Sequence, residues 1–161
     1  IIPRGDAGGV TFFQPSEENA ESAMYTKEYL TSQIIVALGG RAAEEIIYGQ
    51  DRITTGASGD YAQVYMIARE MLTTYGFSAY NFDYRRMSDE ASRLVDMEID
   101  KLVDLCYKEA FGILGANKRQ LELLKDKLLE EEIVDGQWVY DLVNGKCKVG
   151  RSADLDSLDF D

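Results

Sequence analysis

Apolar residues recur at intervals of three and four positions over most of the chain, which is the spacing of amphipathic α-helices. The first such segment begins between residues 22 and 26 and stops at Gly49, a residue type that favours helix ends. The second segment covers residues 58–75 and stops at Gly76. The apolar positions are Leu30, Ile34, Ala37, Leu38, Ala42 and Ile46 in the first segment, and Val64, Ile67, Ala68, Met71, Leu72 and Tyr75 in the second.

Three further helices are predicted after these two. Ser88 and the two acids that follow it are typical of a helix N-terminus, and the long helix that they begin should end near Gly115. Asn117 begins the next helix, and Asp135 begins a short last helix that reaches about residue 143. The chain is therefore predicted to be mainly α, a multi-helix domain. The apolar stripe of the long helix comprises Ala91, Leu94, Val95, Leu102, Cys106, Ala110, Ile113 and Leu114.

Residues 1–15 follow a different pattern, in which a glycine-rich turn separates two short β-prone runs. This pattern predicts a short β-hairpin or an edge strand. Such a pair is not stable alone and must lie on the helices. It could cap the core, or its free edge could bind an extended peptide by β-augmentation. The second run consists of Val10, Thr11, Phe12 and Phe13.

Two adjacent pairs of residues stand out in the first long helix. Gly39 and Gly40 each destabilise a helix by about 1 kcal/mol relative to alanine, so close approach of a crossing helix is expected there. One turn later come Glu44 and Glu45. Solvent exposure is the default for an adjacent pair of acids on a helix, but one of these two must face inward or lie at the edge of the interface.

Composition narrows the function classes. The 161 residues carry a net charge of −12, which opposes binding to nucleic acid or to an anionic membrane surface. No run approaches the roughly 18 apolar residues of a membrane span, so the chain itself is expected to be soluble. With only Cys106 and Cys147, a disulfide framework is not expected, and Cys106 is predicted to be a core thiol. Residues 1–145 are expected to form one domain, followed by an acidic, disordered tail over residues 146–161.

The candidate chemistry lies in the polar turn of residues 54–60, which reads TTGASGD and leads into the second helix. Asp60 ends this turn, and Glu44 on the preceding helix is placed where the two carboxylates could converge. Asp60 could be a metal ligand, or it could be a first-turn acid that complements the helix dipole. Because the chain contains no histidine, it cannot by itself complete a histidine-ligated metal site.

Four ordered blocks of sequence carry a resemblance to a known family. They are IIPRG at residues 1–5, GGVTFF at residues 8–13, ALGGRAAEEIIYG at residues 37–49 and TTGASGD at residues 54–60. Together they resemble the peptidase domain of the FtsH family, which comprises membrane-anchored, ATP-dependent zinc metalloproteases. The resemblance extends over roughly residues 1–143, and the Thr-Thr opening of the turn is most similar to chloroplast and cyanobacterial members.

The resemblance implies a role for each candidate residue. In the family, a HExxH helix supplies two zinc-binding histidines and the general base, and the Asp that matches Asp60 is the third zinc ligand. Glu44 matches an acid close to the zinc, where it could orient a ligand histidine. Val10, Thr11, Phe12 and Phe13 match the edge strand beside the active-site cleft. HExxH is absent from this sequence, so no catalytic residue is assigned and the isolated chain is expected to be inactive.

The resemblance also implies the setting of the complete protein. It would bind zinc, and ATP with magnesium in an AAA+ module outside this sequence. It would assemble as a homo- or hetero-hexamer, be held in a membrane by segments outside this sequence, and degrade unfolded or damaged membrane proteins; the chloroplast thylakoid is the expected location. Two alternatives remain: a catalytically inactive homologue that serves as a scaffold or assembly subunit, and a free-standing helical interaction domain with an acidic surface.

Overall fold

The computed structural model describes residues 24–82 and 85–145, and all the regular structure in this part of the chain is helical. The mainly α prediction is therefore confirmed. The predicted β-hairpin with its strand Val10, Thr11, Phe12 and Phe13, the acidic tail and Cys147 lie outside the described residues. The helices are α2 (Lys27–Tyr48), the 3-10 helix η1 (Gln50–Arg52), α3 (Ser58–Thr73), α4 (Asp89–Ala116), α5 (Lys118–Glu131) and α6 (Gly136–Val143).

Side-chain caps explain where three of these helices begin. The Thr26 hydroxyl accepts a hydrogen bond from the Tyr29 amide at 3.1 Å, and the Ser88 hydroxyl accepts one from the Ala91 amide at 3.1 Å. The Asp135 carboxylate does the same for α6. Each bond satisfies an N–H group that has no partner inside its helix. The predicted starts at Ser88 and Asp135 are thus confirmed.

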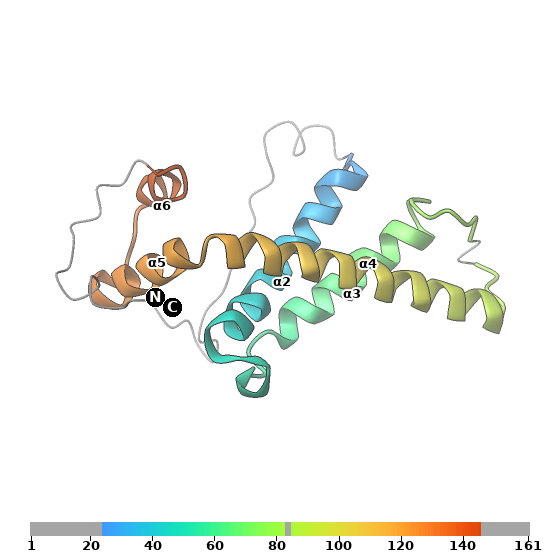
Figure 1. Ribbon diagram of the computed structural model, residues 1–161. Helices are drawn as coiled ribbons and strands as arrows, with labels where there is room; N and C mark the ends of the chain where they lie inside the picture. The colour runs from blue at the N-terminus through green and yellow to red at the C-terminus, as the bar shows by residue number, and fades with distance from the viewer. Residues whose placement is uncertain (1–23, 83–84, 146–161) are drawn as a thin grey trace. The chain divides into compact units, whose positions relative to one another are not determined.

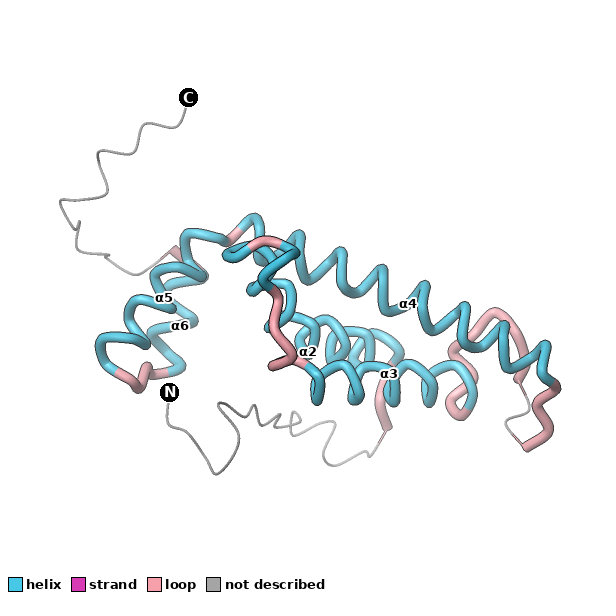
Figure 2. The backbone as a smooth tube through the Cα atoms, turned by 90° about the horizontal axis from the view of Figure 1, so that it is seen from below, coloured by secondary structure: helices cyan, strands magenta, loops and turns pink. Residues whose placement is uncertain are grey.

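The helices fall into two compact units, of which the first contains α2, η1, α3 and α4. In this unit α2, α3 and α4 all pack against one another, as Figures 1 and 2 show from two directions. Their buried faces make one apolar core, in which the largest fully enclosed side chains include Ile34, Leu38 and Met71. The core comprises Leu30, Ile34, Ala37, Leu38, Ala42, Val64, Ala68, Met71, Leu72, Val95, Ile99, Val103, Cys106 and Ala110.

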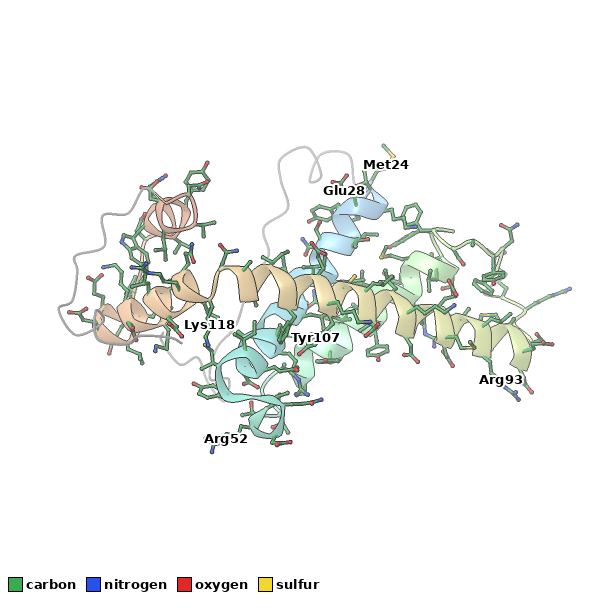
Figure 3. The ribbon with its side chains drawn as sticks, in the orientation of Figure 1. Met24, Glu28, Arg52, Arg93, Tyr107 and Lys118 are labelled. Carbon is green, nitrogen blue, oxygen red and sulfur yellow. The ribbon has the colours of Figure 1, made fainter. Side chains whose placement is uncertain are left out.

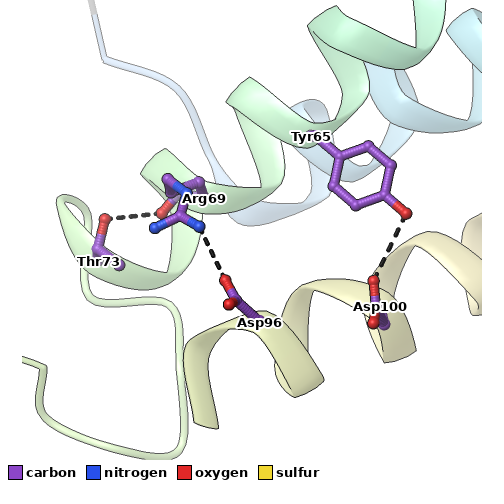
Figure 4. Close-up of polar contacts among 5 residues, drawn as sticks. All are labelled: Tyr65, Arg69, Thr73, Asp96 and Asp100. Carbon is purple, nitrogen blue, oxygen red and sulfur yellow. Dashed lines mark hydrogen bonds and ion pairs between the residues drawn. The ribbon is translucent and has the colours of Figure 1, made fainter. Parts of the chain in front are cut away.

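Polar contacts add to the packing of α3 against α4 (Figure 4). Arg69 forms an ion pair with Asp96 at 2.8 Å, and the Tyr65 hydroxyl lies 3.5 Å from an oxygen of Asp100. Both side chains of the ion pair are more than half exposed, so the pair contributes at most about 1 kcal/mol. The apolar core, rather than this surface pair, holds α3 and α4 together.

The second unit contains α5 and α6, and it has little enclosed apolar surface of its own. Leu142 is its buried residue among those described. The Lys127 ammonium lies 5.1 Å from the centre of the Trp138 ring, which is within the range of a cation–π contact. Trp138 therefore joins α6 to α5.

Three details of the predicted helices need correction. The second helix ends at Thr73 rather than Tyr75, because the Phe77 amide turns back to the Met71 carbonyl at 2.9 Å through Gly76, whose φ is +69°. Leu94 and Ile113 of the predicted apolar stripe are exposed, and Ile99 and Val103, which were not predicted, are buried. Ile99 and Val103 lie four and eight positions after Val95 and so continue its face of the helix, whereas Leu94 lies about 100° away from that face.

None of the described helices makes the expected close approach at Gly39 and Gly40, so the crossing helix there stays a prediction for a segment outside this sequence. A Cβ atom added at either glycine would meet nothing within 4 Å. The buried thiol of Cys106, in contrast, is confirmed, and burial raises the pKa of that thiol. In the described part of the chain, none of the helices has the length and apolar character needed to cross a bilayer.

Candidate metal-ligand site

The connection from α2 to α3 forms the frame of the candidate site. Gly49 ends α2 with φ at +80°, a conformation that side chains rarely adopt, and its carbonyl accepts from the Arg52 amide at 3.1 Å to form η1. The chain then turns through residues 54–57. The Ser58 amide bonds to the Thr55 carbonyl at 3.1 Å, and α3 follows directly.

Glu44 is bound to this turn through both of its carboxylate oxygens. The Thr54 amide donates to Oε2 at 2.9 Å, and the Thr54 hydroxyl donates to Oε1 at 2.8 Å. The amide bond, followed by the hydroxyl bond, lowers the pKa of the Glu44 carboxyl below its usual value of 4.5. Glu44 is therefore the charged acceptor that connects α2 to the turn, and it remains partly exposed to solvent.

Asp60 lies in the first turn of α3, at the end of the helix where a negative charge is favoured. Its side chain is half-buried. No residue of the ranges 24–82 and 85–145 makes a hydrogen bond or an ion pair with its carboxylate. This position suits a dipole-complementing acid and also leaves the carboxylate oxygens free, within the described residues, to bind a ligand.

The structure brings the candidate residues to the same corner but does not bond them together. The Glu44 carboxylate reaches Thr54 and lies 3.9 Å from the place where a Cβ atom on Gly56 would be. Its hydrogen bonds to described residues go to Thr54 and not to Asp60. The convergence of the two acids therefore stays a prediction; the bonds of Glu44 hold the turn that leads to the helix carrying Asp60.

The donors present fit one zinc ligand rather than a complete zinc site. A carboxylate is a common zinc ligand, and the half-buried Asp60 carboxylate makes no hydrogen bond or ion pair with a described residue. However, the chain contains no histidine. Among the described residues, no three acidic, cysteine or histidine side chains gather closely enough to hold a metal. Any zinc bound by Asp60 would need its other ligands from beyond the described residues, and a histidine ligand would have to come from outside this sequence.

Sequence reasoning missed two residues that organise this corner. One is Thr54, although a threonine two positions before a glycine in a turn is a recognised signal for a side chain that bonds the backbone. The other is Tyr107, which is labelled in Figure 3; its hydroxyl donates a hydrogen bond to Glu45, so it connects α4 to α2. Burial, followed by that bond, raises the pKa of Tyr107 to about 12.

Comparisons with a family profile and with individual proteins point to the same protein family. The profile of Peptidase family M41 matches residues 1–142. The chloroplastic ATP-dependent zinc metalloprotease FTSH 1 of Arabidopsis thaliana is 43% identical over 155 residues, a match that covers 85% of this chain and 22% of the relative.

Two further relatives carry similar names. The ATP-dependent zinc metalloprotease FtsH 3 of Synechocystis sp. is 41% identical over 171 residues, covering 92% of this chain and 27% of the relative. The chloroplastic FTSH protease of Medicago sativa is 42% identical over 168 residues, covering 92% and 24% respectively. The chain thus spans about a quarter of the length of the curated relatives that it matches.

Proposed function

Because the chain belongs to Peptidase family M41, we propose that it forms part of the proteolytic domain of an ATP-dependent zinc metalloprotease of the FtsH type. The match of the family profile to residues 1–142 is the observation that carries this proposal. Two relatives at 41–43% identity, whose names state both zinc and ATP dependence, support it.

The role proposed for Asp60 is to supply one zinc ligand. Its position supports this role, because the carboxylate is half-buried at a helix start and makes no hydrogen bond or ion pair with a described residue. When bound, zinc would lower the pKa of a water molecule toward neutrality and polarise the peptide carbonyl that is cleaved. The general base and the remaining ligands would come from outside this sequence, so the 161-residue chain alone is proposed to be inactive.

Glu44 is proposed to act beside the metal rather than on it. Each of its oxygens accepts one hydrogen bond from Thr54, which leaves each oxygen able to accept another. A ligand histidine from outside this sequence could donate to one of them. The strand of Val10, Thr11, Phe12 and Phe13 is proposed to form an edge that pairs with an extended substrate.

The setting of the complete protein is also proposed from its relatives. Relatives from three plants are named as chloroplastic, which supports a chloroplast location, and we extend this to the thylakoid membrane. Its substrates would be unfolded or damaged membrane proteins, and it would assemble as a hexamer. Within this setting, residues 1–145 would be one part of the peptidase domain and residues 146–161 a tail.

Replacing Asp60 tests the proposal directly. In the natural full-length protein, Asp60→Asn should remove stoichiometric zinc and ATP-dependent cleavage of an unfolded protein. The loss should exceed the roughly 10–100-fold that follows removal of an outer hydrogen-bond partner of a metal ligand. Asp51→Asn is the matched control, because Asp51 is an exposed carboxylate of η1 in the same connection. Metal content by mass spectrometry and cleavage rate are the two measurements.

The outcomes separate the proposal from the scaffold alternative. Zinc retained in the Asp60→Asn protein would show that Asp60 is not a ligand. A wild-type protein that forms oligomers but holds no zinc and cleaves nothing would instead support a catalytically inactive assembly subunit.

A further inference from the structure

The hydroxyl of Thr54 is both a hydrogen-bond donor and a hydrogen-bond acceptor. It donates to Glu44 Oε1 at 2.8 Å, and it accepts from the Gly56 amide at 3.1 Å. A second bond, from the Thr54 amide to Glu44 Oε2 at 2.9 Å, holds the same residue against α2. Thr54 is thus connected to a charged side chain of one element and to the backbone of the turn that begins the next.

The start of α3 has no cap of its own to hold it. Its N-cap residue is Ala57, which offers no side-chain acceptor, whereas α2, α4 and α6 begin at Thr26, Ser88 and Asp135 with a capping hydrogen bond. Since uncapped helix starts are weaker by about 1 kcal/mol, another contact must define where α3 begins. In the turn that leads into α3, the Thr55 carbonyl accepts from the Ser58 amide, and the bonds of Thr54 connect this turn to Glu44 on α2.

We propose that Thr54 is a positioning residue for the metal site. By joining Glu44 to the Gly56 amide, its hydroxyl fixes the first turn of α3, and therefore the place of the Asp60 carboxylate, relative to α2. The inference rests on the proposed function, because it assigns a purpose to that placement: a metal ligand must be held to within a fraction of an ångström to match ligands supplied by other segments.

Space around Gly56 supports the same conclusion. A Cβ atom there would lie 3.2 Å from the Thr54 hydroxyl oxygen, which is closer than side chains normally tolerate. The hydroxyl therefore lies directly against the backbone of the turn at Gly56.

Three variants separate the hydroxyl from other properties of the residue. Thr54→Val removes the hydroxyl but keeps the branched shape and the amide bond to Glu44. Thr54→Ser restores the hydroxyl and is expected to rescue. Thr55→Val is the matched control, because Thr55 is the exposed neighbour whose carbonyl, not its side chain, takes part in the turn.

The first measurement is amide hydrogen exchange in the 161-residue chain. Thr54→Val should make the amides of Gly56, Ser58 and Tyr61 exchange about tenfold faster, the size expected when a hydrogen bond to a charged group is lost. Amides in the middle of α2 and α4 should be unchanged. Thr54→Ser and Thr55→Val should both exchange as the wild type does. Unchanged exchange in Thr54→Val would overturn the inference at this step.

The second measurement is zinc affinity and cleavage kinetics in the natural full-length protein. Thr54→Val should weaken zinc binding about tenfold and lower kcat with little change in KM, because the substrate contacts are intact, and Thr54→Ser should restore both. Faster exchange with unchanged zinc affinity would reduce Thr54 to a structural residue and overturn the inference, while the proposed function would stand. A wild-type protein without zinc would refute the proposed function and, with it, the metal role of Thr54; the exchange data would still report on the turn.

Discussion

At the scale of single residues, Tyr107 provides a hydrogen-bond partner for the Glu45 carboxylate at the contact between α4 and α2. Its ring lies among the partly buried residues packed on the core, and its hydroxyl donates to Glu45 across the contact of α4 with α2. Burial opposes ionisation of the phenol, and the neighbouring carboxylate opposes it further, so the pKa of Tyr107 rises to about 12. The bond therefore holds only while the phenol keeps its proton.

This pKa predicts a loss of stability at high pH. Below pH 10 the phenol is neutral in both states, so its contribution is complete. Between pH 10 and about 12 the unfolded chain ionises while the folded chain resists, so the free energy of unfolding falls. In the Tyr107→Phe protein, the free energy of unfolding should fall less over this pH range. Urea unfolding followed by circular dichroism from pH 8 to pH 11.5 measures it.

Tyr48→Phe is the control for this series, since Tyr48 is 59% exposed at the end of α2. Its pH dependence should match that of the wild type. An equally steep fall in the Tyr107→Phe protein would show that other groups cause the alkaline loss.

At the scale of elements, the pattern of apolar spacing was sufficient for most of the core. All five buried residues of α2 and all four of α3 were among the predicted positions. In α4 spacing identified three of the five buried residues and missed Ile99 and Val103, because both sides of the stripe carry large apolar residues and contact with α2 and α3 decides which side is buried. The side-chain bonds of Glu44 could not be predicted either, because they depend on where the connection after η1 places Thr54.

Truncating side chains to alanine should lower the free energy of unfolding more on the buried face of α2 than on its exposed face. Leu38 is fully buried, and Leu38→Ala should lower the free energy of unfolding by about 2–5 kcal/mol through lost burial and the cavity left behind. Val36 lies on the same helix but is 55% exposed, so Val36→Ala should change stability by no more than about 0.5 kcal/mol. Chemical denaturation of both variants checks the difference. Equal effects would mean that α2 does not bury the face described above.

At the scale of the whole molecule, the sequence blocks that resemble FtsH agree with the family match, and the described residues contain no cluster of potential metal ligands. Fold class and family could be predicted from periodicity and ordered motifs. The role of Asp60 could not be decided in this way, because a first-turn acid and a metal ligand share the same sequence position. In the structure, the carboxylate oxygens of Asp60 make no hydrogen bond or ion pair with a described residue, and the described residues provide no cluster of further metal ligands beside it.

The isolated chain should therefore bind no stoichiometric zinc. After equilibration with one equivalent of zinc and dialysis, metal analysis of the 161-residue chain should find much less than one ion per molecule, because the chain has no histidine and its described residues form no ligand cluster. Any weak binding should not change with Asp60→Asn. One tightly held zinc per chain, lost in that variant, would show that this sequence contains a complete site.

The adjacent acids of α2 have a consequence for motion. Glu44 bonds to the connection before α3, and Glu45 accepts from Tyr107 on α4. Consecutive helix residues point about 100° apart, so these two attachments act on α2 from different sides. Rotation of α2 about its own axis would stretch at least one of them. Any movement at this end of the unit should therefore carry α2, the start of α3 and the middle of α4 together as a rigid body, rather than proceed by rolling of one helix against another.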